Sequence, residues 1–319
     1  MILFALEFTH SVGVFAMQIL INVVLPVFLV SGCVALLQPR LRLNGDTLAR
    51  IGLLIFVPAL TLRALLEADG AIGEMLRVTL AVIIVLVVLL ALAELTSRWL
   101  HLGRPQRGAL VSSVVLGNAG AFALPVLVFV YGDAALLPGM FHVILFNVLL
   151  LPLVSIYLAA LQQASLGSAL QRVARTPVVY AAIVGALVRL SGVTVPEPLL
   201  KAVDLVADGA VPLMLVLLGV QLAETFEGGL HFSRLPALAV LVSLRLVVAP
   251  LVALGAATLL GIEGVARVAL VINAGMSTAI LAGALARDYA ADMPLATLGV
   301  LTTTVLALAT TTLWLNWLL

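Results

Sequence analysis

Charged residues are scarce in this chain of 319 residues: Asp, Glu, Lys and Arg together make up 10% of it, against about 25% in soluble domains. Apolar residues reach 64%, and the mean hydropathy is +1.28. A soluble fold is excluded, because its surface would need far more charge. The apolar runs are long enough to cross a bilayer as helices. The sequence therefore predicts an all-α polytopic membrane protein.

Cysteine and histidine are also rare. A single cysteine, Cys33, excludes an internal disulfide and a multi-cysteine metal site, and we expect it to fill space in the first helix. The four histidines stand far apart, which excludes the His-Glu-x-x-His motif of metalloproteases; only His142 lies at a depth where proton transfer is worth weighing, and a surface role is expected for it. A net charge of +1 without basic clusters argues against nucleic acid as a partner. No metal and no cofactor are expected.

Ten spans of about 20 apolar residues are predicted. They cover Val14–Leu36, Leu48–Leu66, Leu76–Trp99, Gly108–Tyr131, Pro138–Leu161, Pro177–Leu190, Leu199–Leu222, Leu235–Leu259, Val265–Leu285 and Pro294–Leu315.

Basic residues divide unequally between alternate loops, with ten (Arg40, Arg42, Arg50, Arg98, Arg104, Arg107, Arg172, Arg175, Arg234, Arg287) against five (Arg63, Arg77, Arg189, Lys201, Arg267). The richer set is expected in the cytoplasm, which puts both termini outside the cell (inner) membrane.

Two of these spans contain residues that interrupt a membrane helix. The fourth holds Gly117, Asn118 and Pro125, and the ninth holds Asn273 and Gly275. Broken backbone at membrane depth is tolerated only where it is buried in protein or lines a water-filled cavity. A pair of interrupted spans, one in each half of the chain, indicates a secondary transporter with its site at the breaks.

Prolines and asparagines recur at similar separations in the two halves. Pro58 and Pro212 are 154 apart, Asn118 and Asn273 are 155 apart, and Pro138 and Pro294 are 156 apart (for example 212 − 58 = 154). Prolines are common in membrane helices, so a coincidence stays open. Five spans per half is an odd number, so a repeat would be inverted, with residues 1–161 and 162–319 as its halves.

Several stretches together resemble the auxin efflux carrier family, which includes bacterial members and plant carriers. The stretches are Gly117–Leu127, Leu244–Pro250, Ala286–Tyr289 followed by Pro294, and Pro212 with Gly219. The resemblance covers the whole chain. It departs at the breaks, because plant members carry proline at both crossing points, whereas Gly117 precedes Asn118 here and no proline lies near Asn273.

The resemblance implies a fold shared with bile-acid/sodium symporters. In that fold the first, second, sixth and seventh helices form a scaffold, and the third to fifth and eighth to tenth form a mobile transport domain. It also implies an organic anion as substrate, such as auxin or a malonate-like carboxylate, and an elevator-type mechanism of export. A proton- or sodium-coupled symporter is the alternative. The lipid bilayer is an expected partner, and a homodimer stays open.

The two asparagines are the first candidates for the substrate site. Asn118 and Asn273 each carry two amide donors, and an interrupted helix exposes backbone N–H groups beside them. Together with Gly120 and Gly275 they are predicted to bind a carboxylate; the alternative is that each asparagine only caps its own half-helix. Asn147 matches a polar position of the family beside the site, and a role in helix packing is equally open.

Charged residues within the spans need partners or a function. Asp208 in the seventh span is the candidate for ion coupling, with capping next to Gly209 as the alternative. Arg245 in the eighth span is expected to form a structural ion pair with Glu94 of the third. The threonines at 302–304 are expected to bond to their own backbone. A membrane-embedded enzyme is a remote alternative, since no catalytic motif occurs. A channel is equally remote, since an inverted repeat argues for alternating access.

Overall fold

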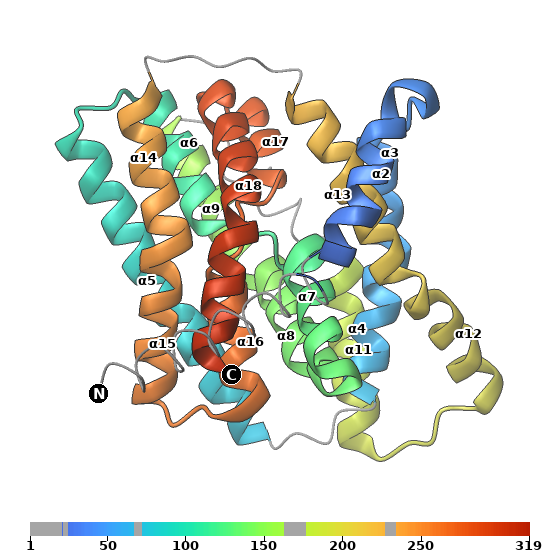
Figure 1. The fold of residues 1–319 in the computed structure, drawn as a ribbon. Helices are drawn as coiled ribbons and strands as arrows, with labels where there is room; N and C mark the ends of the chain where they lie inside the picture. The colour runs from blue at the N-terminus through green and yellow to red at the C-terminus, as the bar shows by residue number, and fades with distance from the viewer. Residues whose placement is uncertain (1–20, 22–24, 67–71, 163–176, 227–233) are drawn as a thin grey trace, which may run out of the picture.

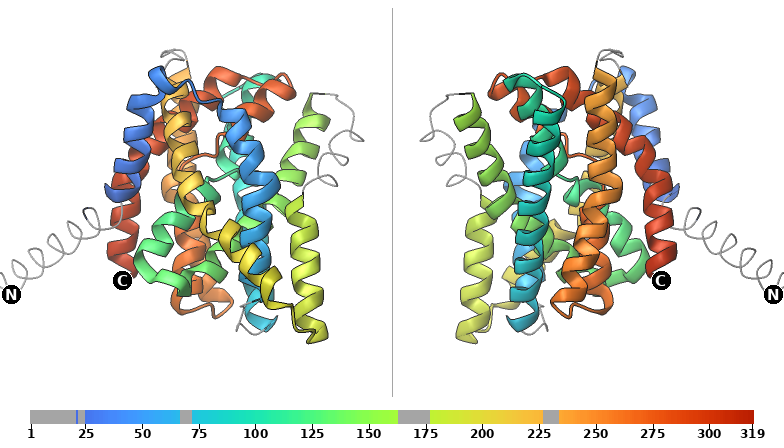
Figure 2. Two further views of the ribbon diagram at one scale, coloured as in Figure 1. Left: turned by 90° about the vertical axis from the view of Figure 1, so that its right-hand side faces the viewer. Right: turned by 90° about the vertical axis from the view of Figure 1, so that its left-hand side faces the viewer.

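The computed structural model describes residues 21, 25–66, 72–162, 177–226 and 234–319. Their regular structure is helical, and one isolated β-bridge is the single strand-like pairing within these ranges. Figures 1 and 2 show helices that mostly run up and down between two ends of the molecule.

The helices of the first half are α2 (Leu25–Leu41), α3 (Gly45–Ile51), η2 (Gly52–Phe56), α4 (Val57–Leu66), α5 (Ile72–Trp99), α6 (Arg104–Val115), η3 (Ala119–Ala123), α7 (Leu124–Tyr131), η4 (Gly132–Ala135), α8 (Leu136–Leu145), η5 (Phe146–Leu150) and α9 (Leu151–Leu161). Those of the second half are α11 (Pro177–Ser191), α12 (Glu197–Asp208), α13 (Ala210–Phe226), α14 (Leu235–Ser243), η7 (Leu244–Val248), α15 (Ala249–Leu259), α16 (Gly264–Ala274), α17 (Leu281–Asp288) and α18 (Met293–Leu318).

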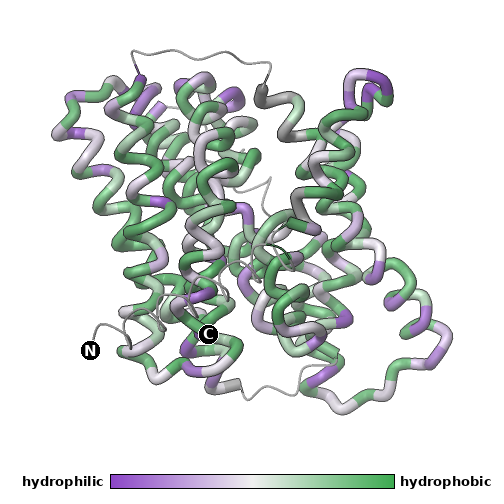
Figure 3. The backbone as a smooth tube through the Cα atoms, viewed as in Figure 1, coloured by the Kyte–Doolittle hydropathy of each residue, from purple (hydrophilic) through white to green (hydrophobic). Residues whose placement is uncertain are grey.

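Within the described ranges, 6 continuous helical stretches are long and apolar enough to cross a membrane, and three further apolar helices are shorter. In Figure 3 the helices are coloured as hydrophobic along most of their length. The expected polytopic all-α membrane fold is thereby confirmed. The start of the first predicted span lies outside the described residues, so the count of ten spans and the inverted repeat stay predictions.

Within the described ranges, four complete π-helical turns interrupt the spans, and each ends two residues before a proline. The prolines are Pro58 after η2, Pro125 after η3, Pro152 after η5 and Pro250 after η7. A proline has no N–H for the carbonyl four residues earlier, and its ring clashes with that carbonyl. Widening the preceding turn relieves the clash. Accordingly, the residue before each proline donates to the carbonyl five residues back, as Ala249 does to Leu244.

The buried side chains form two apolar clusters. One joins α5, α6 and α9 to α14–α18, and the other joins α4, α7, α8, α11 and α13. In Figure 1 the first lies at the left, and α2, α3, α4, α11, α12 and α13 lie at the right. Helix α13 packs against α2, and α4 packs against α11 and α12.

The loops fall at the two ends of the molecule as the alternation of spans requires. The α2–α3, α5–α6 and α17–α18 connections lie at the upper end of Figure 1, whereas the α11–α12 and α15–α16 connections lie at the lower end with the C-terminus. The upper end therefore carries the loops that are richer in arginine.

Candidate functional site

Both predicted helix breaks are present, and the two broken segments pair with each other. Helix α6 ends at Val115, and η3 begins at Ala119. The N–H of Asn118 donates to the carbonyl of Ser277 (2.8 Å), and the N–H of Ala279 donates to that of Leu116 (2.8 Å). This antiparallel bridge is centred on Gly117 and Thr278. It satisfies backbone groups that would otherwise be unpaired in the membrane interior.

The two asparagines do not occupy equivalent places in this crossing. Asn118 directly precedes η3, but α16 continues through Asn273 and ends one residue later. The prediction that the spans cross at Asn118 and Asn273 is therefore wrong for Asn273. The physical reason is that the second break is longer, running from Gly275 to Ile280, so that Thr278 reaches the partner segment.

Arg245 is held at the crossing by backbone carbonyls. It is 3% exposed, and its guanidinium donates to the carbonyls of Met276 (2.8 Å), Val114 (3.0 Å) and Asn273 (3.1 Å). The predicted ion pair with Glu94 is wrong, because α5 carries Glu94 to the end of the molecule where α6 begins. There its carboxylate accepts from a different set of donors, namely Arg98, Arg107 and Tyr157.

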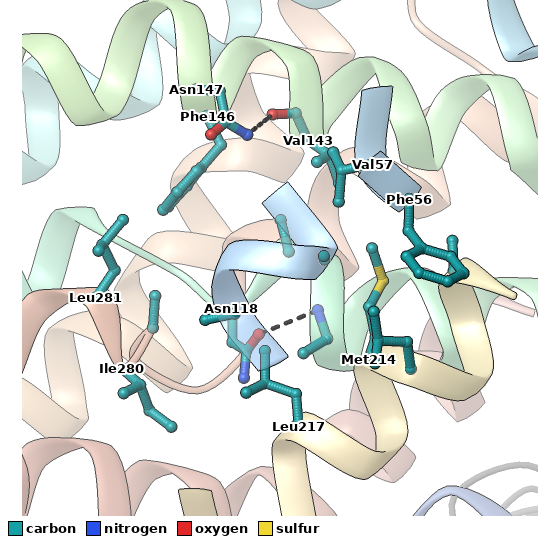
Figure 4. Close-up of a pocket in the computed structure, with 18 of the residues that line it drawn as sticks. Phe56, Val57, Asn118, Val143, Phe146, Asn147, Met214, Leu217, Ile280 and Leu281 are labelled. Carbon is teal, nitrogen blue, oxygen red and sulfur yellow. Dashed lines mark hydrogen bonds between the residues drawn. The ribbon is translucent and has the colours of Figure 1, made fainter. Parts of the chain in front are cut away.

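A cavity of about 220 Å³ lies beside the crossing. Its walls come from α3 and η2, from one face of α13, from η3 and η5, and from the start of α17. The cavity extends to exposed residues, Asp46 of α3 and Ala284 of α17. Its mouth therefore faces the arginine-rich end, and most of its wall is apolar, through residues such as Phe56, Phe146, Met214, Leu217 and Ile280 (Figure 4).

Hydrogen-bond donors at the cavity wall come from two helix N-termini. The Oδ1 of Asn118 accepts from the N–H of Ala121 (3.2 Å), which leaves its Nδ2 without an acceptor among the described residues. The N–H groups of Gly120, Ile280 and Leu281 likewise have no acceptor within the described ranges. Each stands at the start of a half-helix, η3–α7 or α17. Such N-termini favour bound anions.

Asn147 supplies the second side-chain amide of the cavity. It is 3% exposed, and its Nδ2 donates to the carbonyl of Val143 (2.8 Å), one turn earlier in the same span. The Oδ1 is therefore the atom of Asn147 that can meet a hydroxyl or N–H of a bound molecule. Figure 4 shows Asn118 and Asn147 drawn from separate elements around the same space.

Asn273 and Gly275 lie outside the wall of this cavity. The Nδ2 of Asn273 donates to the carbonyl of Ala269 (2.8 Å), and its Oδ1 is buried with no partner in the described part of the chain. A Cβ at Gly275 would lie 3.2 Å from Pro250. Of the five predicted binding residues, the structure thus gathers Asn118, Gly120 and Asn147, and not these two.

Asp208 is the last residue of α12, at the boundary with α13, and it lies at the molecular surface. Its side chain is 72% exposed, and its Oδ1 lies 2.5 Å from a guanidinium nitrogen of Arg63 on α4. Glu197, Lys201 and Asp204 share its face of α12, at spacings of three and four residues. The structure thus places Asp208 on the polar stripe of an amphipathic helix, away from the cavity lining.

Three smaller expectations have mixed outcomes. His142 is 8% exposed and its Nδ1 has no partner in the described part of the chain, so a surface role is wrong. Cys33 is exposed on α2 and is not an interior filler. Thr303 and Thr304 do bond to carbonyls one turn earlier, and the Oγ1 of Thr303 also accepts from the N–H of Thr278.

Sequence reasoning missed most of the cavity wall. Phe56, Phe146, Met214 and Leu217 are ordinary apolar residues of their spans, and nothing in their spacing separates cavity-lining faces from lipid-facing ones. Asp46 was also missed, although a capping asparagine followed by an acid in the first helical turn is a recognisable signal of a helix start. Within the described ranges, no group of three His, Cys, Asp or Glu residues is placed to hold a metal ion.

Comparison with known proteins shows that the chain matches a protein family. Residues 43–315 match the family described as membrane transport protein. The chain is also 25% identical over 274 residues to an uncharacterized transporter of Methanothermobacter thermautotrophicus, an alignment that covers 85% of this chain and 88% of the relative.

Proposed function

The chain belongs to the membrane transport protein family, that of the auxin efflux carriers, and from this premise we propose that it is a secondary carrier for an organic carboxylate anion. Membership makes it a membrane transporter. The substrate class, the mechanism, the direction and the coupling are the proposed part.

One observation supports the substrate class above all others. Two half-helix N-termini and the free amide of Asn118 meet at an apolar cavity that holds no lysine or arginine among its described lining residues. A carboxylate that enters the membrane interior loses water and must find replacement donors. Amide donors and helix termini supply them without a directly contacting cation, and the apolar wall suits the hydrocarbon or aromatic part of an organic acid. Because these donors bind an anion more weakly than a contacting cation would, the same site also allows the substrate to be released.

The cavity's position supports alternating access. Its wall combines α3, η2 and α13 of the proposed scaffold with η3, η5 and α17 of the proposed transport domain. In the proposed elevator mechanism, the third to fifth and eighth to tenth spans move the crossing past a scaffold of the first, second, sixth and seventh. The apolar contacts of α7 and α8 with α4 and α13 would then be the sliding surface.

The arginine distribution supports the orientation. If the richer loops face the cytoplasm, the cavity opens inward and both termini lie outside the inner membrane. An anion leaving a cell moves down the membrane potential, which is worth about 2.3 kcal/mol per charge and 100 mV. We therefore propose export without a coupled ion. Coupling to protons or sodium is the alternative, with Asp208 as its candidate, and a homodimer stays an open expectation.

The decisive experiment is solid-supported-membrane electrophysiology on proteoliposomes. Indole-3-acetate, malonate and a panel of aliphatic and aromatic carboxylates are applied with and without pH and sodium gradients. We expect saturable currents from at least one carboxylate that need neither gradient. Currents that appear only with a gradient would establish the symporter. Flux that does not saturate would indicate a channel, and absence of current and binding for every carboxylate would overturn the anion assignment.

A further inference from the structure

The carbonyl ends of both broken helices converge on one point of the crossing. The last turn of α6 presents the carbonyls of Ser113 and Val114, and the end of α16 presents that of Asn273, with Met276 following in the break. Carbonyls at a helix C-terminus lack intrahelical partners and carry partial negative charge. In membrane transporters with broken helices, such ends commonly coordinate the coupling cation.

In this chain a side chain fills that point. The guanidinium of Arg245 bonds to three of these carbonyls at 2.8–3.1 Å, and the hydroxyl of Thr278 takes the carbonyl of Ser113 (2.9 Å). No carboxylate of the described residues pairs with Arg245, so its charge is balanced by the carbonyl dipoles alone. The η7 turn before Pro250 carries Arg245 to this position.

The backbone around the guanidinium is shaped to admit it. A Cβ at Gly117 would lie 1.6 Å from Nη2 of Arg245, so no side chain other than hydrogen fits there. Gly117 also lines the large cavity. Arg245 is not among the residues that line this cavity, so its positive charge lies behind Gly117 in the cavity wall.

We propose that Arg245 is a tethered cation that occupies the cation site of the crossing permanently. The carrier then needs no sodium or proton at this point to hold its two broken helices together. The charge also remains in place when the cavity is empty, where it favours entry of an anion. The proposal concerns what stabilises the contact between the two broken helices, so it stands whether or not the cavity binds a carboxylate.

The proposal predicts that an empty cation site appears when the side chain is removed. In Arg245→Ala the carbonyls lose their donors, and we expect the melting temperature of the purified protein to fall by several degrees. Guanidinium chloride at millimolar concentration, far below the molar range that unfolds proteins, should restore most of that loss. Sodium chloride is compared with choline chloride at equal ionic strength, to learn whether a metal cation also fits.

Matched variants separate this role from a general loss of stability. Arg245→Lys keeps the charge, so we expect a smaller loss and no response to guanidinium. Gly117→Ala keeps the arginine but places a methyl group where the guanidinium lies. We therefore expect a loss of stability that guanidinium chloride does not reverse. Arg98→Ala removes an exposed arginine of α5 and should show neither effect. If Arg245→Ala cannot be purified without guanidinium but can be with it, the proposal is supported.

Two results would overturn the proposal. One is an Arg245→Ala protein as stable as wild type, and the other is a destabilised one that neither guanidinium nor a metal cation restores. Carboxylate binding by wild type is measured in parallel. Its absence, together with successful rescue of Arg245→Ala, would reject the anion substrate while leaving the tethered cation in place.

Discussion

At the scale of single residues, Asn118 has two tasks that can be separated. Its Oδ1 caps η3, and its Nδ2 has no acceptor in the described part of the chain and lies at the cavity. We predict that Asn118→Ala weakens carboxylate binding about tenfold to a hundredfold, because a hydrogen bond to a charged partner is worth roughly 1.5–3 kcal/mol. Binding of the transported carboxylate, measured by calorimetry or by competition, gives the change.

Asn118→Ser is the matched control, since serine retains an acceptor for the cap but not the amide donor. We expect it to lose affinity as Asn118→Ala does while it keeps the thermal stability of wild type. Asn273→Ala tests the proposed clamp of two asparagines. An affinity loss equal to that of Asn118→Ala would show that Asn273 reaches the anion in another conformation. Wild-type affinity in every one of these variants would place the site elsewhere.

Asp208 allows a second prediction at this scale. Because its carboxylate is mostly exposed and pairs with Arg63, we expect Asp208→Asn to lower the free energy of unfolding by no more than about 1 kcal/mol. Substrate affinity and the gradient dependence of the currents should stay unchanged. A pH- or sodium-dependent current that disappears in Asp208→Asn would instead establish the ion-coupling role.

At the scale of elements, the prolines set the geometry of the crossing. Pro250 forces the π turn that carries Arg245, and the carbonyl of Leu246, four residues before Pro250, accepts from Nε1 of Trp314 (3.0 Å). In Pro250→Ala a regular helix becomes available, since alanine supplies the missing N–H. We predict that Arg245 then leaves its carbonyls and that the transport current falls at least about tenfold while the protein stays folded.

Pro236→Ala is the control for this prediction. Pro236 lies in the first turn of α14, where a helix has no use for the missing N–H. This variant should transport as wild type does. Unchanged currents in Pro250→Ala would show that the π turn does not depend on its proline.

At the scale of the whole molecule, the opening of the cavity and the orientation can be measured together. In a background with Cys33→Ala, we introduce Ala284→Cys at the cavity mouth and Thr194→Cys in the α11–α12 loop at the opposite end. A membrane-impermeant maleimide should label Thr194→Cys in intact cells. It should label Ala284→Cys only in inside-out vesicles, and more slowly when a transported carboxylate is present. The reverse pattern would invert the topology.

The sequence by itself determined the class of the protein and the presence of its breaks. Scarce charge and long apolar runs are compatible only with a membrane fold. In lipid, backbone polar groups must pair within the chain, and unpaired charges are avoided. Glycine, asparagine and proline within two apolar spans indicated where helices stop, since these effects act within a few residues of the chain. The same local signals identified Asn118 and Gly120, and the family resemblance added Asn147; all three line the cavity.

Only the tertiary structure decided which residues contact one another. That Thr278 rather than Asn273 faces Gly117 depends on the length of the second break. Arg245 bonds to backbone carbonyls and not to Glu94, because η7 places it at the crossing, whereas Glu94 lies near the end of the molecule. Asp208 is exposed and pairs with Arg63 of α4 because the polar face of α12 lies at the surface and not at the cavity. These contacts join different spans, and some of them join the two halves of the chain, as Arg245 and Val114 do. A hydropathy pattern cannot encode them, because every span is similarly apolar. The packing of the helices decides which face of each span meets which neighbour.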